Sequence, residues 1–153
     1  MKAVIVYASV HHGNTKKIVD KIANEYEVEL VDATQVKEKE LSGYDVIGFA
    51  SGIYFGKFHR AVLDFASANL PKDKKVFLIS TYGGNAVLRS MKTILEEKHA
   101  DLIGTFSCKG YDTFGPFKFV GGIGKGHPNE KDLAAAVDFY RGLIDGDDAC
   151  HCN

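Results

Sequence analysis

The feature that most constrains the fold is a recurring pattern in which a short apolar run precedes an amphipathic segment. Its first instance begins with Ala3–Ala8, a succession of hydrophobic residues only. Because no polar residues alternate with them, the run is typical of a central strand that is covered on both faces of a parallel sheet. A polar loop follows, and from Asn14 onward apolar residues recur at helical spacing. We therefore expect one strand, a short loop and one helix.

The same alternation repeats through the rest of the chain. Strands that alternate with helices predict an α/β fold, here a doubly wound, five-stranded parallel sheet with right-handed crossovers. The connection at 33–43 shows no clear helix. Further strands are expected at 28–32, 45–51, 75–81 and 101–108. Three further helices are expected around Phe58, Val62 and Phe65, then Val87, Met91, Ile94 and Leu95, and finally Leu133, Val137, Tyr140 and Ile144, with Pro128 in the first turn of the last helix.

Length and composition set further limits. A chain of 153 residues, 45% of them hydrophobic, can bury one core, so we expect one domain at 1–145 and a C-terminal tail at 146–153. The net charge of -1 argues against a nucleic-acid partner. No apolar run approaches the roughly 20 residues that cross a bilayer, and the first run is too short for a signal sequence. We therefore expect no integral membrane segment and a cytoplasmic location.

The loop after the first strand has the composition of a phosphate site. Ligands of open α/β sheets bind beyond the carboxyl ends of the strands. This loop ends at a helix start, where main-chain N–H groups and the helix dipole favour an anion. It contains neither Gly-Lys-Thr nor Gly-x-Gly-x-x-Gly, so a monophosphate is favoured. The alternative is that its polar residues only cap the helix. The residues concerned are Ser9, Val10, His11, His12, Gly13, Asn14 and Thr15.

The loops after the third and fourth strands place aromatic residues beside glycines. Such aromatic side chains can stack on a flat ring, and glycines let main-chain amides approach it closely. Each loop also has a plainer interpretation: Phe55 could belong to the core, and Tyr82-Gly83-Gly84 could be only a turn. Together with the phosphate loop they describe a site for flavin mononucleotide (FMN). The residues are Ser51, Gly52, Ile53, Tyr54, Phe55, Gly56 and Lys57 in one loop, and Thr81, Tyr82, Gly83, Gly84 and Asn85 in the other.

The order of elements, the length and the pattern Ser9-x-x-x-Gly13-Asn14-Thr15 resemble those of a flavodoxin over essentially the whole chain. The resemblance implies a parallel sheet with strand order 2-1-3-4-5 and tightly but noncovalently bound FMN. Within the family, residues 50–59 resemble the second flavin loop of the branch that contains menaquinone-dependent protoporphyrinogen oxidase.

The resemblance also implies roles for individual residues. It assigns the first loop to the phosphate and the other two loops to the isoalloxazine ring, with Tyr54 or Phe55, and Tyr82, as stacking candidates. Many flavodoxins stack a Trp on the flavin, and this chain has none. His11 and His12 stand where other members carry small hydroxyl residues, and solvent exposure is favoured for them over a phosphate contact. Lys16 and Lys17 either lie near the phosphate or form a solvated face of the helix.

The resulting functional hypothesis is an FMN-binding, flavodoxin-like electron carrier that shuttles one or two electrons between redox proteins. The protein supplies binding and tuning, and the redox chemistry belongs to the flavin. A catalytic FMN oxidoreductase of the protoporphyrinogen oxidase or quinone reductase kind is the alternative, and a ligand-binding module without redox turnover is a third possibility. No catalytic residue is assigned, and the oligomeric state is left open.

Three other features need an interpretation. The segment 109–127 combines six glycines with four aromatic residues, and it is either a loop for a partner or the flavin edge, or a flap packed on the last helix. Cys108 is expected to be a buried, small apolar residue. Cys150, His151 and Cys152 are adjacent in the chain and cannot by themselves close a tetrahedral site, so we expect no metal.

Overall fold

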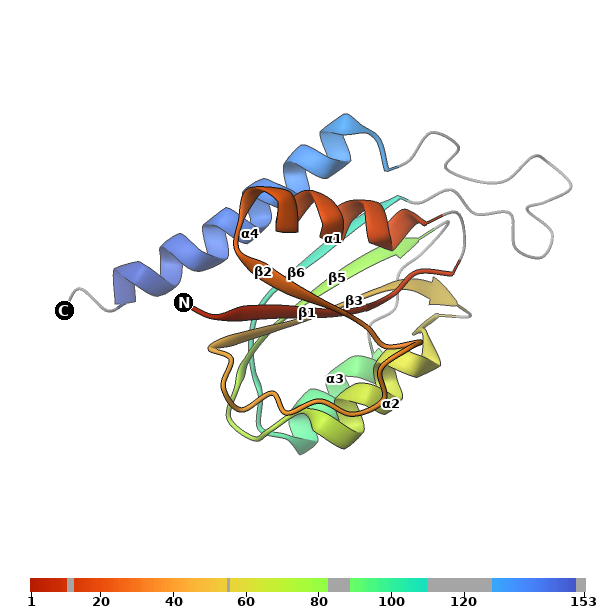
Figure 1. Cartoon of the computed structure of the whole chain (residues 1–153), viewed down its shortest axis with the longest axis vertical. Coiled ribbons are helices and arrows are strands. Elements are labelled where there is room, and N and C mark those ends of the chain that lie inside the picture. Colours follow the sequence, from red (N-terminus) through yellow and green to blue (C-terminus); the bar gives the residue numbers. More distant parts are fainter. Residues whose placement is uncertain (11–12, 55, 83–88, 110–127, 151–153) are drawn as a thin grey trace, which may run out of the picture.

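The computed structural model describes residues 1–10, 13–54, 56–82, 89–109 and 128–150 (Figure 1). Its centre is a parallel sheet in which five long strands lie in the order β2-β1-β3-β5-β6. This is the expected order 2-1-3-4-5 when only the long strands are numbered, so the fold prediction is confirmed. A sixth, very short strand, β4, pairs antiparallel with β3. The strands are β1 (Ala3–Ala8), β2 (Val28–Asp32), β3 (Val46–Tyr54), β4 (Lys57–Phe58), β5 (Lys75–Tyr82) and β6 (Asp101–Lys109).

Helices cover both faces of this sheet (Figure 1). Helices α1 (Asn14–Glu25) and α4 (Glu130–Cys150) lie on one face, and α2 (Arg60–Asn69) and α3 (Arg89–Glu97) lie on the other. Side chains of β1 alternate between the two cores: Val4 and Val6 pack toward α2 and α3, and Ile5 packs toward α1 and α4. Every residue of β1 is buried, which is why the sequence shows a continuous apolar run and not an alternating one.

The connection between β2 and β3 has no helix, as expected from the sequence. It is held instead by the burial of one leucine side chain and by hydrogen bonds to one asparagine of α2. Leu41 is fully buried in the core beneath α2 and α3. The side-chain amide of Asn69 donates to the carbonyl of Lys37 at 2.9 Å and accepts from the N–H of Lys39 at 3.3 Å. A side chain at the end of α2 therefore supplies hydrogen bonds that a helix would have made internally.

Two details of the helix predictions are wrong. Phe58 was expected on the second helix, but it lies in β4, opposite Ile53 of β3, and its side chain is in the core. The chain turns back before it at Gly56, which has a φ of 77°. The periodicity failed because a buried residue just before a helix has the same spacing as one inside it.

Pro128 was expected in the first turn of the last helix, but α4 begins at Glu130. The cap is Asn129, whose Oδ1 accepts from the N–H of Asp132 at 3.0 Å. The Asp132 carboxylate accepts in return from the Asn129 N–H at 2.8 Å. This reciprocal capping box starts the helix after the proline. At its other end α4 continues beyond position 145 to Cys150. None of the helices in the described ranges is long and apolar enough to cross a membrane.

Candidate functional site

Buried polar residues gather at one edge of the sheet. The parallel strands bring their carboxyl ends to the same edge, where α1 also begins (Figure 1). Burying a polar group without a partner costs free energy, so such groups concentrate where structure or a ligand satisfies them. In the part of the chain that the structure describes, all the buried polar residues lie here: Asn14, Thr15, Ser51, Ser80 and Thr81.

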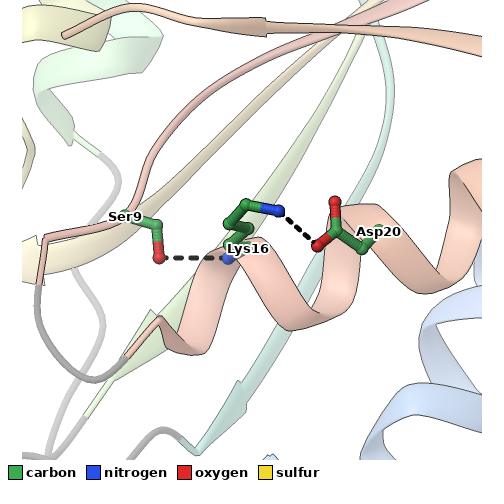
Figure 2. Close-up of polar contacts among 3 residues, drawn as sticks. All are labelled: Ser9, Lys16 and Asp20. Carbon is green, nitrogen blue, oxygen red and sulfur yellow. Dashed lines mark hydrogen bonds and ion pairs between the residues drawn. The ribbon is translucent and has the colours of Figure 1, made fainter.

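The first loop ends at Gly13, which precedes α1 with φ 65° and ψ 22°. This left-handed conformation favours glycine, and the residue offers no side chain to cap the helix. The hydroxyl of Ser9 reaches across the loop and accepts from the N–H of Lys16 at 3.1 Å (Figure 2). The first turn of α1 contains no acidic residue. Hydroxyl groups, main-chain N–H groups and a helix dipole therefore meet without a carboxylate, which suits an anion.

The side chain of Lys16 runs along α1 toward Asp20, away from Ser9 (Figure 2). Its ammonium forms an exposed ion pair with the Asp20 carboxylate at 2.6 Å. The hydrogen bond to Asp20 raises the pKa of Lys16, so this side chain stays charged. Of the two roles left open for Lys16, the structure shows the solvated face. Val10 is also exposed.

A buried hydroxyl pair joins the first loop to the end of β5. Thr15 Oγ1 and Thr81 Oγ1 are 3.0 Å apart, and both side chains are almost fully buried. The two residues are far apart in the sequence, so this contact brings together two of the three loops that the sequence singled out. Thr15 and Thr81 therefore lie next to each other at this edge of the sheet.

On the opposite face of the sheet, serines form a row across three neighbouring strands. Ser51 of β3 lies in register with Ser80 of β5, and Ser80 with Ser107 of β6. The hydroxyls of Ser80 and Ser107 are 2.7 Å apart. The Ser51 hydroxyl donates to the carbonyl of Gly52 at 2.6 Å and accepts from the N–H of His59 at 2.8 Å. The Ser51 hydroxyl therefore links the main chain on the two sides of the second loop, at Gly52 and at His59.

The second loop is a tight return from β3 into β4. Tyr54 of β3 pairs with Lys57 of β4. Tyr54 is partly exposed and Lys57 is exposed. An ideal Cβ on Gly52 would lie 3.0 Å from the Tyr54 hydroxyl oxygen, so the phenol packs against the Gly52 main chain. Ile53 packs on the core beneath α2 and α3 instead of facing outward.

Some expected site residues lie outside the described residues, and some residues of the site were missed. Ser80, Ser107 and His59 were not predicted, although they contact or extend the loops that were. A histidine directly before an apolar helical pattern was a usable signal for His59, because side-chain acceptors are favoured at that position. For Tyr82 only the main chain is described. The expected residues outside the described part are His11, His12, Phe55, Gly83, Gly84, Asn85 and the segment 110–127.

Comparison with known proteins identifies the protein family to which this chain belongs. Residues 4–109 match the family model of the flavodoxin domain. The chain therefore belongs to the flavodoxin family, which confirms the family expected from its sequence. It is 41% identical over 149 residues to an uncharacterized protein of Methanocaldococcus jannaschii, and the match covers 94% of this chain and 99% of that protein.

Solved structures show the same fold. Oxidised Flavodoxin 2 from Bacillus cereus is 22% identical, with a TM-score of 0.70 and coverage of 95% of this chain and 99% of that chain. A flavodoxin from the domain Archaea is 20% identical, with a TM-score of 0.63 over 94% and 99% of the two chains. The rubredoxin oxygen:oxidoreductase of Desulfovibrio gigas matches over 94% of this chain but 36% of its own, at 16% identity and a TM-score of 0.69.

Cys108 lies beside this edge of the sheet, and its thiol is not suited to act as a nucleophile. It lies opposite Thr81 in the sheet register, and its side chain is buried, as expected. Burial raises the pKa of the Cys108 thiol to about 12, and the Asp132 carboxylate adds to the shift. A thiol with so high a pKa carries little thiolate at neutral pH, so it is a poor nucleophile.

This pKa predicts a loss of stability in alkali. Well below pH 9 the thiol is protonated in both the folded and the unfolded protein, and its contribution to stability is constant. Between about pH 9 and 12 only the unfolded chain releases the proton, so the free energy of unfolding falls by up to about 1.4 kcal/mol per pH unit. Urea unfolding of the parent and of Cys108→Ala, in reductant from about pH 8 to pH 11, should show a shallower fall in the variant. Parallel pH profiles would contradict this prediction.

Proposed function

We propose that this protein binds FMN at the carboxyl edge of its sheet and transfers electrons to and from other redox proteins. One observation carries the proposal: the buried hydroxyls of Thr15 and Thr81 meet at the start of α1, whose first turn has no carboxylate. Membership of the flavodoxin family supports a flavin as the group that this edge accommodates.

The donor set fits the phosphate end of FMN. The hydroxyls of Ser9 and Thr15 and the first N–H groups of α1 can donate to phosphate oxygens, and the positive end of the helix dipole favours the charge. The loop lacks the lysine of a nucleoside triphosphate site. A single phosphate therefore suits this loop better than a pyrophosphate or a triphosphate.

The ring end would lie between the other two loops. Tyr54 on the 51–57 loop is the stacking candidate with a described side chain, and Tyr82 and Phe55 remain predictions from the sequence. When bound, FMN supplies the redox chemistry, since it accepts and returns one or two electrons. The residues of this chain hold the cofactor, orient it and shield it from water.

The cofactor is identified by releasing it from the purified protein. The untreated protein should show a flavin absorption spectrum, and chromatography of the heat-released compound should give FMN. Recovery of FAD, or no yellow complex after reconstitution with FMN, would contradict the proposal.

A steady-state assay separates an electron carrier from an enzyme. We expect no sustained turnover with NAD(P)H or a quinol alone, because a carrier depends on protein partners. Turnover with either would favour the oxidoreductase of the protoporphyrinogen oxidase or quinone reductase kind. The cytoplasmic location and the protein redox partners stay predictions.

Thr15→Ala tests the phosphate contact. Loss of a buried hydroxyl that donates to a charged phosphate should weaken FMN binding by about 1.5–3 kcal/mol, or between about tenfold and a hundredfold in Kd. Titration of apoprotein with FMN, followed by quenching of flavin fluorescence, gives the Kd. Thr93→Ala is the control, because the Thr93 hydroxyl donates to the Arg89 carbonyl on α3, away from this edge. An unchanged Kd in Thr15→Ala would remove Thr15 from the site.

A further inference from the structure

The rings of Tyr54 and His59 meet edge to face at the second flavin loop. Their centroids are 5.6 Å apart and their planes are inclined by 84°. Edge-to-face pairs with centroids at this distance are attractive because the positive edge of one ring meets the negative face of the other. The contact therefore fixes the orientation of the one described aromatic side chain that the sequence offers for stacking on the flavin.

His59 is itself held tightly by the main chain around it. Its N–H donates to Ser51 Oγ at 2.8 Å, and its Nδ1 accepts from the N–H of Ala61 at 3.0 Å. Its carbonyl accepts from the N–H groups of Val62 and Leu63. The side chain is thus the N-cap of α2. An Nδ1 that accepts a hydrogen bond carries no proton, so the neutral ring is protonated at Nε2.

Tyr54 is restrained by the loop as well. Its phenol packs against the main chain of Gly52, where a Cβ would come within 3.0 Å of its hydroxyl oxygen. Gly52 is joined through its carbonyl to the Ser51 hydroxyl, which also receives the His59 N–H. Ser51, Gly52, Tyr54 and His59 therefore form one connected unit between the end of β3 and the start of α2.

We propose that His59 is a positioning residue of the flavin site: its ring sets the place of Tyr54, and its cap contacts tie that ring to α2. This inference rests on the proposed function, since it concerns how the 51–57 loop is held beside the flavin. His59 needs no contact with the cofactor for this role. It acts through Tyr54, so its effect appears in FMN binding and in the flavin potentials.

Two substitutions separate the ring from the cap. His59→Asn keeps an acceptor for the Ala61 N–H, because asparagine is a preferred N-cap residue, but it removes the ring. His59→Phe keeps a ring that can meet Tyr54 edge to face, but it removes the acceptor. Each variant therefore keeps one of the two properties and loses the other. A general loss of stability would affect FMN binding in both variants and would not distinguish them.

We expect the two variants to differ in opposite ways in apoprotein stability and in FMN affinity. His59→Asn apoprotein should melt like the parent, yet its FMN Kd should rise by about two- to tenfold, which is the size of an edge-to-face contact. The midpoint potentials of its bound flavin and the ring-proton resonances of Tyr54 should shift. His59→Phe should recover most of the lost affinity, although its apoprotein melts at a lower temperature.

A double variant tests whether His59 acts through Tyr54. In a Tyr54→Leu background, His59→Asn should cause no further change in Kd. The inference is overturned if His59→Asn has the Kd and potentials of the parent, if the Kd of both variants follows apoprotein stability, or if the two changes are independent. Failure of the parent itself to bind FMN would instead refute the proposed function, and this inference with it.

Discussion

A Ser9→Asp variant is expected to lose FMN affinity by at least about a hundredfold while its apoprotein remains as stable as the parent. The Ser9 hydroxyl accepts from the N–H of Lys16 at the start of α1, and an aspartate can accept the same hydrogen bond. A carboxylate is favourable at a helix N-terminus. The same charge would repel the phosphate of FMN, because two unit charges about 4 Å apart interact by about 4 kcal/mol at an effective dielectric constant near 20.

The matched control is Ser9→Asn, because asparagine has nearly the same shape as aspartate but carries no charge. Thermal unfolding of the apoproteins and fluorescence titration with FMN should be measured on all three proteins. We expect Ser9→Asn to bind FMN far more tightly than Ser9→Asp. Equal affinities in the two variants, at equal stability, would show that no anion lies near Ser9 and would contradict the phosphate assignment.

A Gly48→Val variant is expected to lose about 3 kcal/mol or more of unfolding free energy, because the core has no room for a side chain there. An ideal Cβ on Gly48 would lie 2.3 Å from Cζ of Phe77 on the neighbouring strand. The Phe77 ring cannot simply turn away, since it packs edge to face against Phe139 and Tyr140 of α4. The strain therefore spreads to the contact between the sheet and this helix.

Gly142→Ala in α4 is the control for this substitution. A Cβ on Gly142 would meet nothing within 4 Å, and alanine is the better helix former by about 0.5–1 kcal/mol. Urea unfolding should therefore show Gly142→Ala to be more stable than the parent and Gly48→Val to be much less stable. A Gly48→Val variant with the stability of the parent would contradict the close packing of Gly48 on β3 against the Phe77 ring on β5.

Local spacing was sufficient to predict most of the elements. The continuous apolar run of Ala3–Ala8 reflects burial on both faces of β1, and the spacing of Val137 and Tyr140 reflects the buried side of α4. Spacing failed at Phe58, because this residue lies in β4 and pairs with Ile53 of β3 across a turn. It also failed at Pro128, where the reciprocal hydrogen bonds of Asn129 and Asp132 decided the helix start.

The candidate loops could also be predicted from the sequence, because the carboxyl ends of parallel strands must share an edge. The assignment of Ser9 and Thr15 to the candidate site rests on this ground and stays a prediction. The contacts within the site could not be predicted in the same way. Thr15 meets Thr81, and Ser80 meets Ser107, only after the strands have aligned. No local pattern encodes contacts between residues that are 66 and 27 positions apart in the chain.

The sequence by itself determined the order of strands and helices, the family and the three loops that could hold a flavin, since each depends on residue types at short spacing. The tertiary structure alone decided which side chains meet. It brought Thr15 to Thr81 and Ser80 to Ser107, and it placed His59 against Tyr54. The physical reason is that these contacts depend on strand register and helix position, which long-range packing determines.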